Sequence, residues 1–64
     1  MSWKREGGRV IQQYPGFLQL PPRHGTVVRV LASGAVTIRW DDSQVGHTYS
    51  TADLEDMWLS DPLA

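Results

Sequence analysis

Few side chains in this sequence are of types that carry out catalysis, and their spacing matches no known catalytic motif. His47, Ser50 and Asp53 lie close together and represent the three side-chain types of a hydrolytic triad. A triad needs a base within hydrogen-bond reach of the serine and a third group that orients the base. No nucleophile motif surrounds Ser50. We therefore expect these residues to serve in a strand and a helix cap, and we predict that the chain is not an enzyme.

Metal and cofactor sites are not indicated either. The chain has no cysteine, and its two histidines, His24 and His47, have no neighbouring ligand pattern. Zinc sites are built from cysteine, histidine and carboxylate ligands at characteristic spacings, and phosphate-binding loops are rich in glycine. The sequence therefore predicts no metal, no cofactor and no disulfide. A domain of 64 residues must then depend on a compact core, which self-association can reinforce.

Aromatic side chains are the first feature that indicates binding. The sequence contains Trp3, Tyr14, Phe17, Trp40, Tyr49 and Trp58. One alternative is a cage that holds a methylated cation against the ring faces, with Asp41 or Asp42 at its rim. Trp3, Tyr14 and Phe17 are the aromatic residues least explained by core packing, and Tyr14 and Phe17 flank a proline-rich loop. We predict that these two residues anchor a protein partner.

Charge is distributed unevenly along the chain, although the net charge is −1. All six Lys and Arg residues lie before position 40, and six of the seven acids lie after it. This division indicates either a basic face for an acidic partner or two halves that attract each other within one fold. The candidates for contacts to nucleic-acid phosphates are Arg29 and Arg39, together with Arg23, Arg9, Lys4 and Arg5. The pI near 6.0 is low for a dedicated binder. Nucleic acid is therefore the alternative partner.

The elements that must position these residues are mostly strands, predicted at 9–14, from Thr26 onward, at 35–41 and at 47–50. Alternation in the third of these places Val36, Ile38 and Trp40 in the core. In the preceding strand, Val28 and Val30 are then expected to face inward, opposite Ile38 and Val36. Gly34 suits the left-handed position of a turn at 32–34. This register predicts a partner-binding outer patch of Val27, Arg29, Leu31 and Arg39.

The remaining segments are predicted to be a loop and a helical turn. Pro15-Gly16 and Pro21-Pro22 break regular structure, and the apolar residues between them, Phe17, Leu18 and Leu20, are expected to fold back over the core. Ser50 or Thr51 caps a helical turn in which the acids of 53–56 favour the first turns. Leu54 and Trp58, spaced i, i+4, are expected to face the core.

These features together resemble the small SH3-like barrels, a group that includes Tudor, KOW-type and related bacterial domains. The resemblance rests on a glycine turn, the strand end "IRWDD", a short strand with a tyrosine, and "ADLE" in a helical turn. It implies an all-β, five-stranded barrel over residues 9–60, preceded by a flexible basic arm at 1–8 and followed by a tail at 61–64. Typical members carry glycine directly after the aspartate, whereas here it comes at position 46.

The function that we predict is a cytoplasmic, non-catalytic interaction module that binds a protein or a second copy of itself. The residues assigned to this role are Tyr14, Phe17, Arg23, Val27, Arg29, Leu31 and Arg39. Among small SH3-like chains, the plasmid-borne dihydrofolate reductases are an exception that becomes an enzyme by forming a tetrameric pore. Their Val-Gln-x-Tyr strand is absent, and "VGHTY" stands here instead. An enzyme site built only in a homo-oligomer is therefore a remote alternative.

Overall fold

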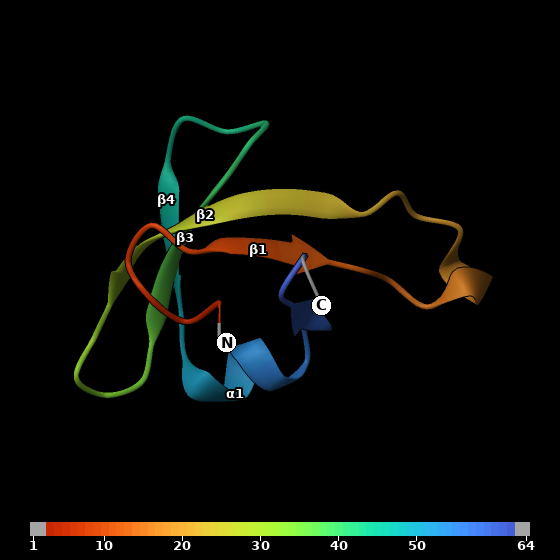
Figure 1. Ribbon diagram of the computed structural model, residues 1–64. Coiled ribbons are helices and arrows are strands. Elements are labelled where there is room, and N and C mark those ends of the chain that lie inside the picture. Colours follow the sequence, from red (N-terminus) through yellow and green to blue (C-terminus); the bar gives the residue numbers. More distant parts are fainter. Residues whose placement is uncertain (1–2, 63–64) are drawn as a thin grey trace.

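The structure, a computed structural model, describes residues 3–62 and consists of one open antiparallel sheet and a short α-helix (Figure 1). The elements are β1 (Arg9–Gln12), η1 (Gly16–Leu18, a 3-10 helix), β2 (Arg23–Val30), β3 (Val36–Trp40), β4 (Gly46–Tyr49), α1 (Thr51–Glu55) and β5 (Leu59–Ser60). The strand order in the sheet is β4-β3-β2-β1-β5. The predicted small all-β fold with five strands is confirmed. The outer ends of the expected arm and tail, residues 1–2 and 63–64, lie outside the described residues.

The core lies on one face of the sheet and is closed by α1. Its buried side chains are Val10, Val27, Val36, Ile38, Trp40 and Leu54. The inward alternation predicted for β3 is confirmed, because strict period-two patterning leaves a strand one way to bury its apolar side chains. Trp40 also satisfies its buried indole, since Nε1 donates a hydrogen bond to Tyr49 Oη at 2.9 Å.

The inward orientation predicted for Val28 and Val30 of β2 is wrong, because neither side chain is buried. Val27 faces the core with 1% of its surface exposed, whereas Val28 is 49% and Val30 is 39% exposed. Arg29 and Val30 do pair with Thr37 and Val36 as predicted, but a bulge between Val27 and Arg29 shifts the preceding residues, so that Val27 pairs with Ile38. Val27 therefore does not belong to an outer patch.

Gly25 gives the physical reason for this bulge. It pairs with Trp40, and a Cβ built on it would lie 2.9 Å from both Ile38 Cγ2 and Trp40 Cε3. Without the bulge, Thr26 would stand opposite Trp40 and its side chain would enter this space. One extra residue in β2 keeps the glycine beneath the indole ring and bends the strand.

The turn between β2 and β3 has the predicted glycine geometry. Gly34 donates its N–H to the carbonyl of Leu31 at 2.9 Å and has a φ of 93°, a conformation that a residue with a Cβ adopts at a cost. The N–H of Leu31 then bonds to the carbonyl of Ala35 at 2.9 Å. The hairpin turn was therefore correctly predicted from its residues.

The helix after β4 begins as predicted but is shorter than expected. Ser50 is its N-cap, and a capping box joins Ser50 to Asp53, which satisfies amides that have no partner within the helix. Leu54 is buried as predicted. Trp58 is 51% exposed and has a φ of 51°, so its predicted place in the core is wrong. The helix ends at Glu55, and the i, i+4 spacing therefore no longer applies at position 58.

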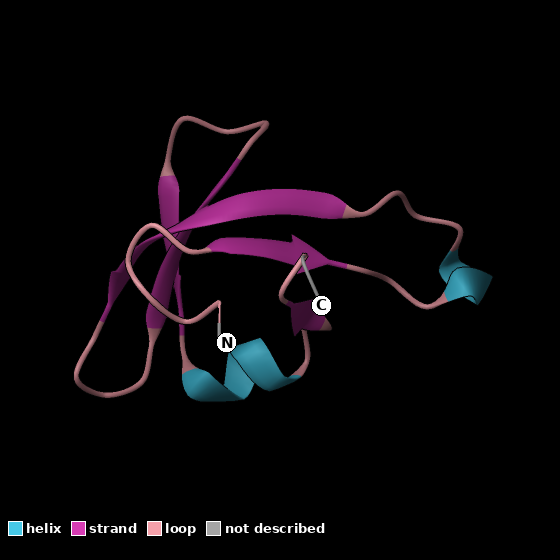
Figure 2. Ribbon diagram, in the orientation of Figure 1, coloured by secondary structure: helices cyan, strands magenta, loops and turns pink. Residues whose placement is uncertain are grey.

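The loop between β1 and β2 does not fold back over the core. We name residues 13–22 the apolar tip. Figure 2 shows η1 at the far end of the β1–β2 hairpin, well separated from α1. Phe17 is 83% exposed, and Leu18 and Leu20 are exposed as well. The reason is that β2 begins at Arg23, paired with Gln12, so the hairpin continues to the base of the loop and carries the tip outward.

The segment before β1 runs beside β2. Gly7 donates its N–H to the carbonyl of Val27, and Val27 donates to the carbonyl of Gly8, both at 2.8 Å. Trp3 is half-buried against the core. Within residues 3–62, no helix is long and apolar enough to cross a membrane.

Candidate interaction site

The structure divides the predicted site residues among four places, one of which is the core, where Val27 lies. Tyr14 and Phe17 lie in the apolar tip, and Arg23 lies at its base in β2. Arg29 and Arg39 lie on the face of the sheet opposite the core, while the half-buried Leu31 begins the β2–β3 turn. The patch expected around Val27 is therefore not formed as predicted, and the tip emerges as a separate surface.

The apolar tip is ordered by its own backbone. Leu18 donates its N–H to the carbonyl of Pro15 at 3.0 Å, and Gln19 donates to that of Gly16 at 3.1 Å. Gln19 closes this turn in the left-handed region with a φ of 52°. Prolines at both ends fix further backbone angles and lower the conformational entropy of the free segment. The exposed Phe17 therefore stands on a preformed turn.

Two aromatic rings stand at the base of the tip. The Tyr14 and Trp58 rings pack edge to face, with centroids 6.0 Å apart, and the N–H of Gln13 donates to the Trp58 carbonyl at 3.2 Å. Tyr14 Oη donates to Gln12 Oε1 at 3.0 Å. A shallow cavity of about 310 Å³ next to the rings is lined by Gln13, Tyr14, Leu20 and Pro22. Trp58 is thus a site residue that the sequence analysis assigned to the core.

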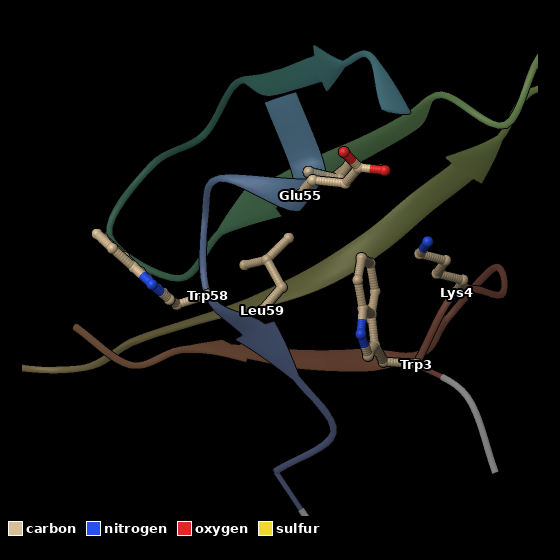
Figure 3. Close-up of a pocket in the computed structure, with 6 residues that line it drawn as sticks. Trp3, Lys4, Glu55, Trp58 and Leu59 are labelled. Atoms are coloured by element: carbon tan, nitrogen blue, oxygen red, sulfur yellow. The ribbon is translucent and has the colours of Figure 1, made fainter. Parts of the chain in front are cut away.

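A second shallow cavity is lined in part by Trp58. It has a volume of about 300 Å³ and is lined by Trp3, Lys4, Leu54, Glu55, Trp58 and Leu59. Figure 3 shows Trp3 and Trp58 on opposite sides of this cavity, with Leu59 between them and Glu55 above. The Lys4 ammonium lies 5.6 Å from the centroid of the Trp3 ring. Trp58 therefore packs on Tyr14 at the base of the tip and also lines a cavity that reaches the segment before β1.

Arg23 ties the base of the tip to the core. Its guanidinium carbon lies 4.4 Å from the centroid of the Trp40 ring, a cation–π contact, and Nη2 lies 3.5 Å from Asp42 Oδ1. Its Nε is buried without a hydrogen-bond partner within residues 3–62. These contacts hold the start of β2, and with it one end of the tip, in a fixed place.

The face of the sheet opposite the core is polar and carries most of the arginines. Across β2, β3 and β4, Thr26 pairs with Arg39, Arg29 pairs with Thr37, and Thr37 pairs with Thr48. The hydroxyls of Thr37 and Thr48 lie 2.7 Å apart. Arg9 forms an ion pair with Asp41, and hydrogen bonds from its guanidinium hold the pKa of Asp41 below the ordinary value. Arg29 and Arg39 form no ion pair with any residue of 3–62.

The three residue types of a hydrolytic triad do not form one here. Ser50 Oγ accepts a hydrogen bond from the N–H of Asp53 at 3.2 Å, and the N–H of Ser50 donates to Asp53 Oδ2 at 3.3 Å. The His47 ring lies in β4, 6.4 Å from the Tyr49 ring. The strand and cap roles predicted for these residues are confirmed. No group of three histidine or carboxylate side chains suited to a metal ion occurs within 3–62.

Comparisons with protein-family models, with curated proteins and with solved structures gave no significant match for this chain.

Proposed function

We propose that this chain is a non-catalytic interaction module that docks a protein partner through the apolar tip and the Tyr14–Trp58 pair. The observation that carries the proposal is the exposure of Phe17, 83%, at the end of a hairpin in which residues 10–22 contain no charged side chain. In soluble proteins, contiguous exposed apolar surface marks a binding site. The chain as a whole is 20% charged, so the tip differs from the surface around it.

The preformed turn explains how such a small surface binds. Association costs conformational entropy for each side chain and loop that must become ordered. The tip is already held by its backbone hydrogen bonds and prolines, so less of this cost remains. In the proposed complex Phe17 enters a pocket of the partner, while Tyr14 and Trp58 supply amphipathic aromatic area of the kind enriched at interface hot spots.

We propose in addition that the sheet is that of an SH3-like small barrel. The support is that β1 to β4 form an antiparallel meander, and β5 returns after α1 to pair with β1. This pairing brings the two ends of the chain to neighbouring strands. A fold of this class hosts many functions, so the interaction surface and not the fold carries the functional proposal.

Site-specific photo-crosslinking in the native cells tests the docking proposal. A photoreactive phenylalanine analogue replaces Phe17 in one variant and Val28, an exposed residue of the β2 bulge, in the matched control. We expect a discrete crosslinked protein from position 17 and not from position 28. For the identified partner, Phe17→Ala should then weaken binding by about tenfold or more, as for an interface hot spot. Equal crosslinking from both positions, or none from position 17, would contradict the proposal.

Nucleic-acid binding is the second candidate, and one observation favours it. The acids that would repel phosphates are either paired or lie off the sheet, because Asp41 and Asp42 contact Arg9 and Arg23, and the acids Asp53 and Glu55 lie on α1. Arg29 and Arg39 are left to contact phosphates. Fluorescence anisotropy with a labelled DNA oligonucleotide should then show binding that falls steeply with salt and is lost in the Arg29→Glu, Arg39→Glu double variant. Binding that is absent at low salt would exclude this candidate.

A further inference from the structure

The outer edge of β4 carries an inference about a second copy of the chain. We propose that two copies pair antiparallel through their β4 strands about a two-fold axis, so that the two sheets become one. This surface is distinct from the apolar tip and does not depend on the proposed docking function.

The first argument is that the edge of β4 is open. β4 is the last strand of the sheet and pairs with β3 alone. Gly46, His47 and Thr48 are exposed, and within residues 3–62 the backbone of 46–49 forms no hydrogen bond with any element other than β3. Such an edge presents a row of unpaired N–H and C=O groups that can pair with another strand.

The second argument is that the two edge strands of the sheet differ in the features that prevent pairing with another strand. At the opposite edge, β5 has two residues and is followed directly by Asp61-Pro62. Short length, charge and proline are the usual means by which proteins block edge pairing. β4 is twice as long, with four residues, and it has neither of the other two features, because residues 43–52 contain no proline and no Asp, Glu, Lys or Arg. The edge formed by β5 therefore carries features that block strand pairing, whereas the edge formed by β4 carries no blocking charge or proline.

The third argument concerns the molecule that pairs with β4, which we infer to be a second copy of the chain. A two-fold axis brings the same residues of both copies together, so a strand that pairs with itself must carry no charge that repels its own copy. β4 meets this condition with Gly46, His47, Thr48 and Tyr49. Val45, which precedes the strand, is 62% exposed and would be partly covered at the junction. A net charge of −1 adds little repulsion between copies.

Sedimentation equilibrium and hydrogen–deuterium exchange over a range of protein concentrations test the proposal. We expect a monomer–dimer equilibrium in which amide protection within 46–49 rises with concentration while protection within β3 does not. Thr48→Lys places a cation from each copy at the junction and should weaken dimerisation by about tenfold or more, following the cost of like charges on paired strands. The matched control is Val28→Lys, which adds the same charge at an exposed position of β2, two strands away from the edge of β4.

Phe17→Ser distinguishes this interface from association through the tip. A dimer that persists in Phe17→Ser and gains concentration-dependent protection in β4 supports the proposal. A chain that stays monomeric at all concentrations overturns it. A dimer that is lost in Phe17→Ser, or that forms without protection in β4, also overturns it.

Discussion

Arg9 and Asp41 form a two-pronged ion pair that spans three strands. Nη1 of Arg9 lies 2.9 Å from Asp41 Oδ1, and Nη2 lies 2.7 Å from Oδ2. Nη1 also donates to Thr26 Oγ1 at 2.8 Å, so the guanidinium crosses β2 to reach the residue that follows β3. Bidentate pairs of this kind are the most directional of the charge-assisted hydrogen bonds. The basic first part of the chain and its acidic second part are thus joined within one fold at this point.

The first prediction concerns the pH dependence of stability. Hydrogen bonds from Arg9 lower the pKa of Asp41 in the folded state. A carboxyl with a lowered folded pKa contributes stability that is complete above its unfolded pKa, about 3.9, and is lost as the pH falls through the folded value. Asp41→Asn should therefore lower the thermal midpoint at neutral pH, and the difference from the wild type should vanish in strong acid.

Thermal unfolding of both proteins at neutral and strongly acidic pH measures this effect. The matched control is Asp42→Asn, which removes the same charge from the neighbouring residue but breaks only a single contact of 3.5 Å, to Arg23. The Asp41 pair is exposed, so the shift is expected to be small. A midpoint difference for Asp41→Asn that stays constant from neutral pH to strong acid would show that the ion pair is not its source.

The second prediction follows from the bulge in β2. Val27 is buried and Val28 is exposed, so the two adjacent valines should respond differently to the same substitution. Val27→Ala should lower the free energy of unfolding by about 2 kcal/mol, through lost burial and the cavity that remains. Val28→Ala should change it by less than about 0.5 kcal/mol. Urea denaturation of the two variants checks this. A larger loss of stability in Val28→Ala than in Val27→Ala would contradict the bulge and support the register without it.

The contrast between β3 and β2 shows which parts of the fold the sequence predicts. β3 was predicted correctly because each inward residue is apolar and each outward one is polar, so local alternation is sufficient. In β2 both Val27 and Val28 are apolar, and the choice between them is made by Gly25 beneath Trp40. That contact joins two strands, and a pattern read along a single strand does not contain it.

The candidate site was predicted in part for a similar reason. Tyr14 and Phe17 were identified because a proline-rich loop leaves aromatic residues without a core position. Trp58 was missed because its i, i+4 spacing from Leu54 suits a longer helix. The acids at 53, 55 and 56 together with Met57 offered no sign that α1 ends at Glu55. The structure supplies the missing information, because the pairing of Leu59–Ser60 with β1 requires the chain to leave the helix before position 59.

The third prediction concerns the buried indole of Trp40. Its Nε1 donates to Tyr49 Oη at 2.9 Å, and the two rings pack edge to face with centroids 6.5 Å apart. Tyr49→Phe keeps the ring and removes the acceptor, which leaves a buried N–H without a partner. This should lower the free energy of unfolding by between about 1 and 3 kcal/mol. Urea denaturation measures the change, and a variant as stable as the wild type would mean that water reaches the indole.

The last prediction separates the backbone of Trp58 from its side chain. Trp58 has a φ of 51°, a left-handed conformation that costs a residue with a Cβ about 1 kcal/mol or more and costs glycine little. Trp58→Gly and Trp58→Ala both remove the indole that packs on Tyr14, so their difference reports the backbone alone. We expect the glycine variant to be more stable than the alanine variant by about 1 kcal/mol, measured by urea denaturation.

The same pair of variants also connects this turn to the proposed docking surface. Because both lack the indole, both should lose affinity for the protein that crosslinks to position 17, and by the same factor. An alanine variant as stable as the glycine variant would contradict the left-handed turn at position 58. Affinity that is retained in both variants would instead remove Trp58 from the docking surface and leave the tip itself as the contact.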